Sequence, residues 1–328
     1  MFKQIKLAAI AATVVAAAGV ANAAEFKPAI VFDMGGKFDK SFNEAAFNGA
    51  EEFKKGSGID YMEFEVTQVS QREQAMKRMA KKGATIIVAM GFAQASAVEK
   101  AAKANPDTKF TIIDMVVDLP NVQSIVFKEH EGSFLVGMAA ALSSKTGKVG
   151  FVGGMDIPLI RKFALGYVEG AKYAKSGTEV FQNMTGTTPS AWNDPTKGGE
   201  LARSQFDRGA DVVFAAAGGT GIGVYQAAKD SGKFAIGVDS NQNYMHPGTM
   251  LTSMTKRVDV AVKEAFATAK AGTWQAGIKV LGLKEGGVGY AVDEHNKGVL
   301  SADVVAKLEK ARADIISGKL KVTNYMSK

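Results

Sequence analysis

Residues 28–44 have the sequence PAIVFDMGGKFDKSFNE, in which a strand-like run, a glycine turn and a helix start follow one another. The first seven residues are apolar, with β-branched and aromatic side chains, apart from Asp33 near the end. Ser41 and Glu44 have the S-x-x-E spacing of a capping box at the first turn of a helix. The stretch therefore predicts one β-loop-α unit with Asp33 at the end of its strand.

Similar units repeat along the rest of the chain. In the first half, strands are predicted at 28–34, 61–67, 85–90, 109–114 and 121–127, with helices at 41–55, 70–82 and 94–104. In the second half, strands are predicted at 148–153, 178–184, 211–217 and 234–239, with helices at 157–175, 196–209 and 221–231. The alternation predicts two similar α/β lobes with mostly parallel sheets. Runs such as VVFA at 212–215 are almost continuously apolar, which is typical of strands buried on both faces.

Polar and glycine residues follow the predicted strands at the ends where α/β proteins bind ligands. In open α/β sheets, ligands lie beyond the carboxyl ends of the strands. The residues at these positions are Asp33, Gly91, Asp114, Gly218, Gly219 and Asp239. Two lobes that align these ends would face each other across a ligand-binding cleft.

The loop after the first strand is the richest candidate for ligand contacts. It holds Phe38, Asp39, Phe42 and Asn43 within six residues. Phe42 and Asn43 would lie in the first turn of the helix, where free N–H groups and a partial positive charge can meet a ligand. The alternative is structural, with Phe42 in the core and Asn43 solvated.

A second candidate group lies late in the chain, where GVDSNQ at 237–242 is followed by LTSMTK at 251–256. Asp239 can accept two hydrogen bonds from a vicinal diol, and Lys256 can supply a charged donor. Together they suit a ribose or another polyol. The alternative is a surface salt bridge between the two residues.

Five aromatic residues are available to such a cleft. They are Phe38, Phe42, Phe92, Phe163 and Trp192. Trp192 lies in the loop GTTPSAWND at 186–194, where it either anchors the loop or offers a flat face for stacking a heterocycle. The glycines of GGTGIG at 218–223 let the backbone approach a ligand closely, but their order and late position do not fit a dinucleotide-binding motif.

The composition excludes several classes of chemistry. The chain has 328 residues, of which 46% are hydrophobic and 22% charged, so it is long enough for two globular domains of roughly 150 residues each. It holds no cysteine and three histidines, and lacks the H-E-x-x-H, G-x-S-x-G and phosphate-loop motifs. The adjacent aspartates that nucleoside hydrolases use to bind calcium are also missing. We therefore expect neither an enzyme nor a metal or cofactor site.

Residues 1–23 are predicted to be a secretory signal peptide. Lys3 and Lys6 precede a fourteen-residue apolar run, which is too short for a membrane span, and Ala21-Asn22-Ala23 is a small-residue cleavage site. Without these residues, 305 remain and the net charge falls from +7 to +5. This positive charge is small, and the sequence has no clustered basic stripe, so we expect no nucleic-acid partner. We expect a periplasmic, monomeric protein without a lipid anchor.

The motifs resemble those of a known family when taken in order. The matching stretches are DMGGKFDKSFN (33–43), GF (91–92), FTIID (110–114), GKVGFVGG (147–154), GADVVF (209–214), GVD (237–239) and LTSMTK (251–256). The sequence is similar to the basic membrane protein (BMP) family of ABC-transporter substrate-binding proteins, whose best understood members bind purine nucleosides. This resemblance covers nearly all of the chain after residue 23.

The resemblance implies a type I periplasmic-binding fold, with two doubly wound α/β lobes joined by three crossover strands. The crossovers are expected near 126–128, 250–256 and 284–292. The N-terminal lobe would then combine 24–126 with 256–284, and the C-terminal lobe 128–250 with 290–328.

The resemblance also implies roles for individual side chains. The segment Asp39–Asn43 and Asp114 would contact the edge of a base, and Phe42 and Trp192 would stack on its faces. Asp239 and Lys256 would hold the ribose hydroxyls, while Asp33 would contact the ligand or brace its loop. The expected function is capture of guanosine, inosine or adenosine and delivery to a permease. A sugar receptor on the same fold and an exported nucleoside hydrolase are the alternatives.

Overall fold

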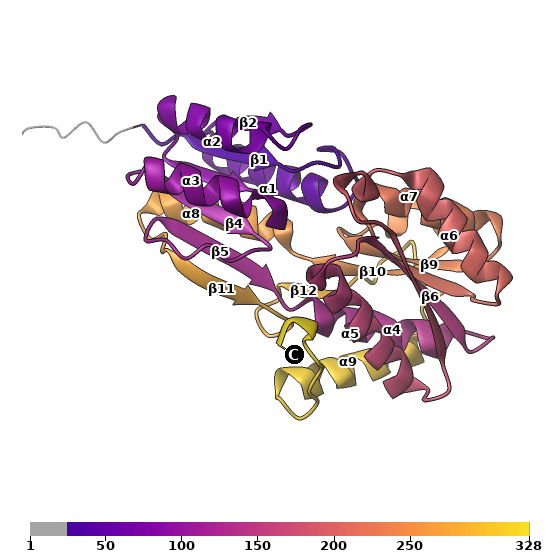
Figure 1. The fold of residues 1–328 in the computed structure, drawn as a ribbon. Coiled ribbons are helices and arrows are strands. Elements are labelled where there is room, and N and C mark those ends of the chain that lie inside the picture. The colour runs from indigo at the N-terminus through magenta and orange to yellow at the C-terminus, as the bar shows by residue number, and fades with distance from the viewer. Residues whose placement is uncertain (1–24, 328) are drawn as a thin grey trace, which may run out of the picture.

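The predicted α/β units form two sheets of six strands each in the computed structural model, which describes residues 25–327 (Figure 1). The predicted signal peptide lies outside these residues. The first sheet has the order β11-β5-β4-β3-β1-β2, and its neighbouring strands are parallel. Its strands are β1 (Pro28–Phe32), β2 (Met62–Glu65), β3 (Ile86–Ala89), β4 (Lys109–Ile113), β5 (Val122–Phe127) and β11 (Gly277–Leu281). Its helices are α1 (Phe42–Ser57), α2 (Gln71–Lys81), α3 (Ala95–Ala104) and α8 (Val258–Ala271).

The second sheet repeats this topology in the order β12-β10-β9-β8-β6-β7. Its strands are β6 (Lys148–Met155), β7 (Glu179–Gly186), β8 (Val212–Ala216), β9 (Phe234–Asp239), β10 (Met250–Lys256) and β12 (Val288–Tyr290), the last antiparallel to β10. Its helices are α4 (Glu129–Ser143), α5 (Pro158–Ala174), α6 (Pro195–Asp207), α7 (Gly221–Asp230) and α9 (Ala302–Ile316). Short 3₁₀ turns follow several strands: η1 (Phe92–Gln94), η2 (Pro189–Trp192), η3 (Gly218–Thr220), η4 (Asn243–Met245) and, near the end of the chain, η5 (Tyr325–Ser327).

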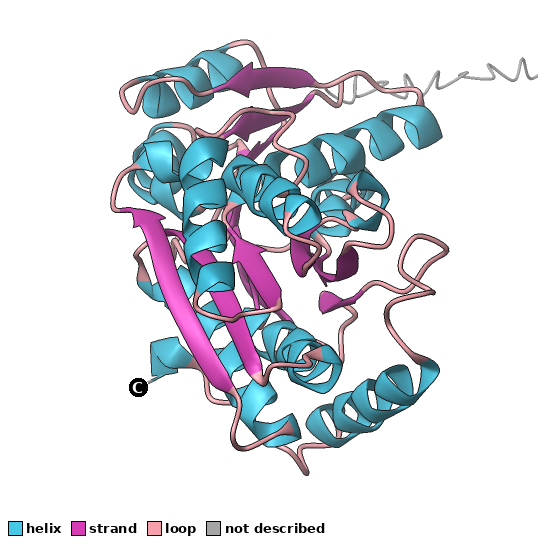
Figure 2. Ribbon diagram, turned by 90° about the vertical axis from the view of Figure 1, so that its right-hand side faces the viewer, coloured by secondary structure: helices cyan, strands magenta, loops and turns pink. Residues whose placement is uncertain are grey.

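Helices cover both faces of each sheet, which explains the almost continuous apolar strands (Figure 2). In β1, Ile30 and Phe32 join the core that includes α1 and α8, whereas Ala29 and Val31 join the core beneath α2 and α3. All of β1 is buried in consequence. No helix of residues 25–327 is both long and apolar enough to pass through a bilayer.

The chain crosses between the lobes three times. The first crossing follows β5, and the third lies between β11 and β12, over residues 282–287. The second differs from the expected crossover at 250–256, because that segment is strand β10 and pairs with β9 along the second sheet. The crossing therefore comes at Arg257, and 128–256 lies continuously in the second lobe.

Both sheets reverse their strand order next to the first strand of the lobe. The first sheet has β2 and β3 on either side of β1, and the second has β7 and β8 on either side of β6. Doubly wound sheets bind ligands at such switch points, beyond the carboxyl ends of the strands. The arrangement thus predicts one site made from both lobes.

Candidate ligand-binding site

A cavity lies between the two lobes, with about 640 Å³ of empty space when the solvent at its opening is included. Its walls come from loops and strand ends of both sheets. They consist of Asp33, Met34, Asp39, Phe42, Asn43, Gly91, Phe92, Asp114, Leu159, Ile160, Phe163, Trp192, Ala216, Ala217, Gly218, Val238, Asp239 and Lys256.

The cavity brings together ten of the twelve candidate residues from the sequence, and Phe38 and Gly219 do not line it. The Phe38 side chain is 59% exposed and packs edge-on against Phe47, with ring centroids 5.2 Å apart. The Lys37 ammonium lies over both rings, so Phe38 belongs to a surface cluster. Gly219 adjoins the lining residue Gly218 and lies against the Trp192 carbonyl.

Several apolar wall residues were not among the candidates from the sequence: Met34, Leu159, Ile160, Ala216, Ala217 and Val238. A signal for two of them was present. Leu159 and Ile160 lie in the first turn of α5, which begins at Pro158 shortly after β6, just as Phe42 begins α1 after β1. The rule that places ligands at strand ends could therefore have identified this second helix start.

Asp39 caps helix α1, a role that the S-x-x-E pattern predicts for Ser41. Its carboxylate accepts hydrogen bonds from the N–H groups of Ser41 (2.8 Å), Asn43 (3.1 Å) and Glu44 (3.1 Å). The predicted capping box is wrong, because the Ser41 hydroxyl makes no cap hydrogen bond and Glu44 accepts from the Lys40 N–H instead. Burial raises the pKa of Asp39 to about 7, against the lowering effect of the three N–H donors.

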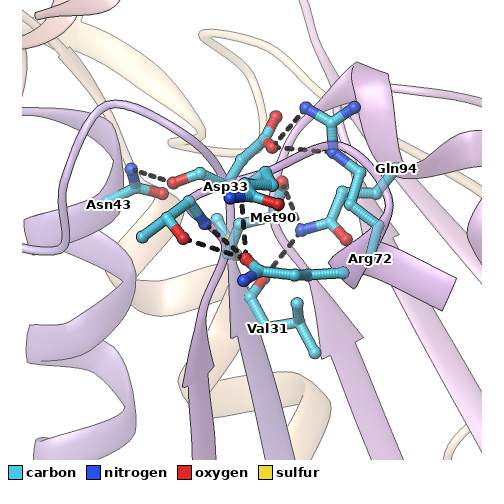
Figure 3. A network of polar contacts seen from close by, with 9 residues as sticks. Val31, Asp33, Asn43, Arg72, Met90 and Gln94 are labelled. Atoms are coloured by element: carbon cyan, nitrogen blue, oxygen red, sulfur yellow. Dashed lines mark hydrogen bonds and ion pairs between the residues drawn. The ribbon is translucent and has the colours of Figure 1, made fainter. Parts of the chain in front are cut away.

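Asn43 and Asp33 brace the glycine loop between β1 and α1 (Figure 3). The Asn43 amide donates to the carbonyls of Asp33 and Gly36, both at 3.1 Å. The Asp33 carboxylate accepts from the Arg72 guanidinium at 2.8 and 3.1 Å, and both side chains are largely buried. Burial nevertheless raises the pKa of Asp33, although Arg72 opposes this. Asp33 thus combines a place in the cavity wall with a bracing ion pair.

Several hydrogen bonds join the N-terminus of α1 to the end of β9 across the lobe boundary. The Ser41 hydroxyl donates to the Asp239 carboxylate at 2.5 Å. The Gln242 amide donates to the Lys40 carbonyl at 2.9 Å, and the Ser240 hydroxyl donates to the Ser41 carbonyl at 3.2 Å. These contacts depend on both lobes being close together.

Lys256 is the cation at the centre of the cavity wall. Its ammonium group lies 2.6 Å from Asp114 and 3.1 Å from Glu129, and its side chain is 2% exposed. It also lies 5.0–5.7 Å from the ring centroids of Phe42, Phe127 and Phe163. The carboxylates raise the pKa of Lys256 against the effect of burial, so the ammonium stays charged. The site therefore differs from a surface salt bridge, and Lys256 pairs with Asp114 and Glu129.

Two carboxylate residues of the site have left-handed backbone conformations. The φ angles are 71° at Asp114 and 62° at Asp239, each at a strand end. Such angles are uncommon for residues other than glycine, and they cluster at functional sites where the surrounding structure enforces them. Both residues with these φ angles, Asp114 and Asp239, line the cavity.

Trp192 lines the cavity from the second lobe, packed against β6. A Cβ atom added at Gly154 would lie 2.2 Å from the indole ring, so the missing side chain of Gly154 is what admits the ring. Phe42 lines the cavity from the first lobe. The two aromatic residues thus come to the cavity from opposite lobes.

Comparison with known proteins extends these observations. The family model described as "ABC transporter substrate-binding protein PnrA-like" matches residues 26–325. The chain belongs to the Bmp family. This family consists of substrate-binding proteins of ABC transporters, so it is a transport family and not an enzyme family.

Relatives of this Bmp protein share most of its length. The ABC transporter nucleoside-binding protein BmpA of Lactococcus lactis is 35% identical and is matched over 91% of this chain and 89% of its own. An uncharacterized lipoprotein of Pyrococcus horikoshii is 38% identical, over 80% of this chain and 68% of its own. A crystal structure of an ABC transporter solute-binding protein from Aeropyrum pernix has a TM-score of 0.84 at 30% identity, covering 92% of this chain and 96% of its own. The type I periplasmic-binding fold is confirmed.

The Bmp cavity contains oxygen atoms that have no partner in the described part of the chain. The Asn43 amide oxygen Oδ1 and the Asp114 oxygen Oδ1 are buried and accept no hydrogen bond from residues 25–327. Buried acceptors without a partner are uncommon in folded proteins. Both residues line the cavity.

Proposed function

We propose that this protein captures purine nucleosides between its lobes and delivers them to the permease of an ABC importer. The observation that carries the proposal is the combination of aromatic faces and unpartnered acceptors in one cavity. Phe42 and Trp192 offer flat faces from opposite lobes, and Asn43 and Asp114 each offer a free oxygen. A purine nucleoside has a stacking surface and N–H and O–H donors in one molecule.

The base and the ribose would use different parts of the cavity. The base would stack on Phe42 and Trp192, with its N–H groups toward Asn43 and Asp114. The ribose hydroxyls would donate to Asp239, and Lys256 would donate to a ribose oxygen. The name of the Lactococcus lactis relative, a nucleoside-binding protein, supports this class of ligand.

Binding and closure would be coupled because the wall belongs to both lobes. A ligand stabilises the closed form only to the extent that it binds that form more tightly than the open form. A nucleoside held by Phe42 and Asn43 from one lobe, and by Trp192 and Asp239 from the other, would do so. Closure would present the permease with a loaded form that differs in shape from the empty one.

Calorimetric titration tests the proposal. The protein would be titrated with guanosine, inosine, adenosine, uridine, hypoxanthine and D-ribose. We expect submicromolar binding of at least one purine nucleoside and weaker binding of the free base and the free sugar. Binding of D-ribose alone would assign the site to sugars, and no binding of any nucleoside at millimolar concentration would overturn the proposal.

A hydrolase is distinguished by its products. Incubation with inosine should return inosine unchanged, with no release of hypoxanthine. Catalytic release of the base would contradict a transport role.

We also propose that the mature protein is periplasmic, carries no lipid anchor and acts as a monomer. The predicted signal peptide and the absence of cysteine from the 328 residues support this location, whereas the Pyrococcus relative is named a lipoprotein. Cell fractionation should recover the protein in the periplasmic extract. Recovery with the membranes would contradict the unanchored form.

A further inference from the structure

Glu129 is a buried carboxylate that stands behind the cavity wall. It is the first residue of α4 and follows the first crossing between the lobes by two residues. Its side chain is 0% exposed, and it does not line the cavity. No sequence motif points to Glu129, and the proposed ligand contacts do not include it.

Both oxygens of Glu129 face lysines. Oε1 lies 3.1 Å from the Lys256 ammonium, and Oε2 lies 2.5 Å from the Lys162 ammonium. Within residues 25–327 these oxygens accept no hydrogen bond, so the two ammonium groups interact with them as ion pairs. The two positive charges lower the pKa of Glu129 although burial acts to raise it. Glu129 is thus an ionised bridge between one lysine in the cavity wall and one lysine behind it.

The second lysine is held firmly. The Lys162 ammonium also donates to the Phe127 carbonyl at 2.9 Å, at the end of β5. Helices α4 and α5 are in backbone contact near it, since a Cβ atom at Gly166 would lie 2.4 Å from the His130 carbonyl oxygen. Lys162 and Glu129 therefore lie where α4 and α5 are in contact, next to the first lobe crossing.

The ammonium group of Lys256 has three N–H donors. One of them is donated to Asp114 of the first lobe, and Glu129 of the second lobe lies 3.1 Å from the same ammonium group as an ion pair. Without Glu129, the ammonium group would be attracted to Asp114 alone and would move from its place in the cavity wall. The position of this ammonium group thus depends on a residue that does not line the cavity.

We propose that Glu129 is the positioning residue for Lys256, and that its bridge to Lys162 sets the affinity of the cavity for the oxygen atoms of a nucleoside. This inference rests on the proposed function. It adds a determinant of affinity outside the cavity wall, located where the chain passes between the lobes.

The test compares Glu129→Gln with Glu131→Gln. Glu131 is a nearly buried carboxylate on the same helix, accepts from the Leu283 N–H and contacts neither buried lysine. We expect Glu129→Gln to raise the Kd for guanosine or inosine at least tenfold and Glu131→Gln to change it less than threefold. Equal losses in both variants would overturn the inference.

A second variant separates positioning from folding. In Glu129→Gln with Lys162→Met, the lysine that lost its partner is also removed, so much of the lost thermal stability should return. The affinity for the nucleoside should remain at least tenfold weaker than that of the wild type, because the Glu129 carboxylate that positions Lys256 is still missing. Recovery of affinity together with stability would show that Glu129 acts only on folding.

A measurement without ligand makes the inference testable even if no nucleoside binds. Acetylation of Lys256 by an acylating reagent, followed by mass spectrometry, should be at least tenfold faster in Glu129→Gln than in the wild type and in Glu131→Gln. Unchanged protection of Lys256 would overturn the positioning role. Absence of nucleoside binding by the wild type would instead overturn the proposed function.

Discussion

The Lys256 ammonium is shared by carboxylates from the two lobes and is surrounded by three aromatic rings. Lys256→Met would leave Asp114 and Glu129 buried with less compensation. Removing one partner of a buried ion pair costs about 3–5 kcal/mol, so we expect a loss of that order in the free energy of unfolding, measured by urea denaturation. Nucleoside binding should be lost as well.

The matched control for this variant is Lys263→Met. Lys263 pairs with Glu52 at 3.1 Å, but both side chains are about half exposed. Exposed pairs contribute little to stability. Comparable destabilisation by the two substitutions would contradict the importance given to burial around Lys256.

Asp39 gives the stability of the protein a pH dependence. Its pKa is about 7 in the folded protein and 3.8 as the ordinary value, so folding favours the protonated carboxyl. The resulting stabilisation is complete below about pH 4 and is lost as the pH rises through 7. The asparagine of Asp39→Asn does not titrate, so the free energy of unfolding of the wild type should fall relative to that of Asp39→Asn as the pH rises from 4 to 7. The fall should be at most about 1.4 kcal/mol for each unit between the folded and unfolded pKa values. Urea titrations between pH 4 and 8 would measure it, and a constant difference would contradict the raised pKa.

At the scale of the element, the sequence predicted strands well because burial on both faces requires a continuous apolar run. The predicted strand 234–239 coincides with β9, and the predicted helix 94–104 differs from α3 by one residue. The cap of α1 was not predictable from the S-x-x-E pattern, because Asp39 competes for the same N–H groups from two residues earlier.

The candidate site was predictable wherever its residues follow strands directly. Asp33, Asp114 and Asp239 could be selected by that rule alone. Glu129 and Lys162 could not be selected from the sequence. Their ion pair joins helices α4 and α5, and Glu129 contacts the cavity wall through Lys256, which lies far along the chain. Phe38 was predicted to line the cavity but packs on Phe47 instead. The residue type alone does not indicate which side of the loop a side chain faces.

Strand β6 and turn η2 are in contact where the Trp192 ring packs against Gly154. Gly154→Ala would place a methyl group within the space of the indole ring, so the ring must move out of its place in the cavity wall. We expect at least a tenfold loss of nucleoside affinity and a shifted tryptophan fluorescence maximum. Gly56→Ala in helix α1 is the control, since its added methyl group meets nothing within 4 Å. An unchanged affinity in Gly154→Ala would show that the position of Trp192 does not matter for binding.

At the scale of the whole molecule, the bond from Ser41 to Asp239 favours the closed arrangement of the lobes. Hydrogen bonds to charged groups contribute roughly 1.5–3 kcal/mol. Because this bond needs both lobes close together, Ser41→Ala should weaken nucleoside binding about tenfold or more. The radius of gyration of the ligand-free variant, from small-angle X-ray scattering, should increase.

Ser240→Ala removes a neutral hydrogen bond across the same boundary and should have a smaller effect. If both serine variants bind and scatter like the wild type, the contacts between α1 and β9 do not control closure.

The three crossings also fix the order in which the lobes can be completed during synthesis. The first sheet has its edge strand β11 and its helix α8 at residues 258–281, after the entire run 128–256 of the second lobe. At roughly 5–20 residues per second, the ribosome needs about 7–26 seconds to make that run. During this interval the first lobe exposes the strand β5 edge and the face of α1 that α8 later covers. The first lobe therefore cannot be completed until residues 258–281 have been made.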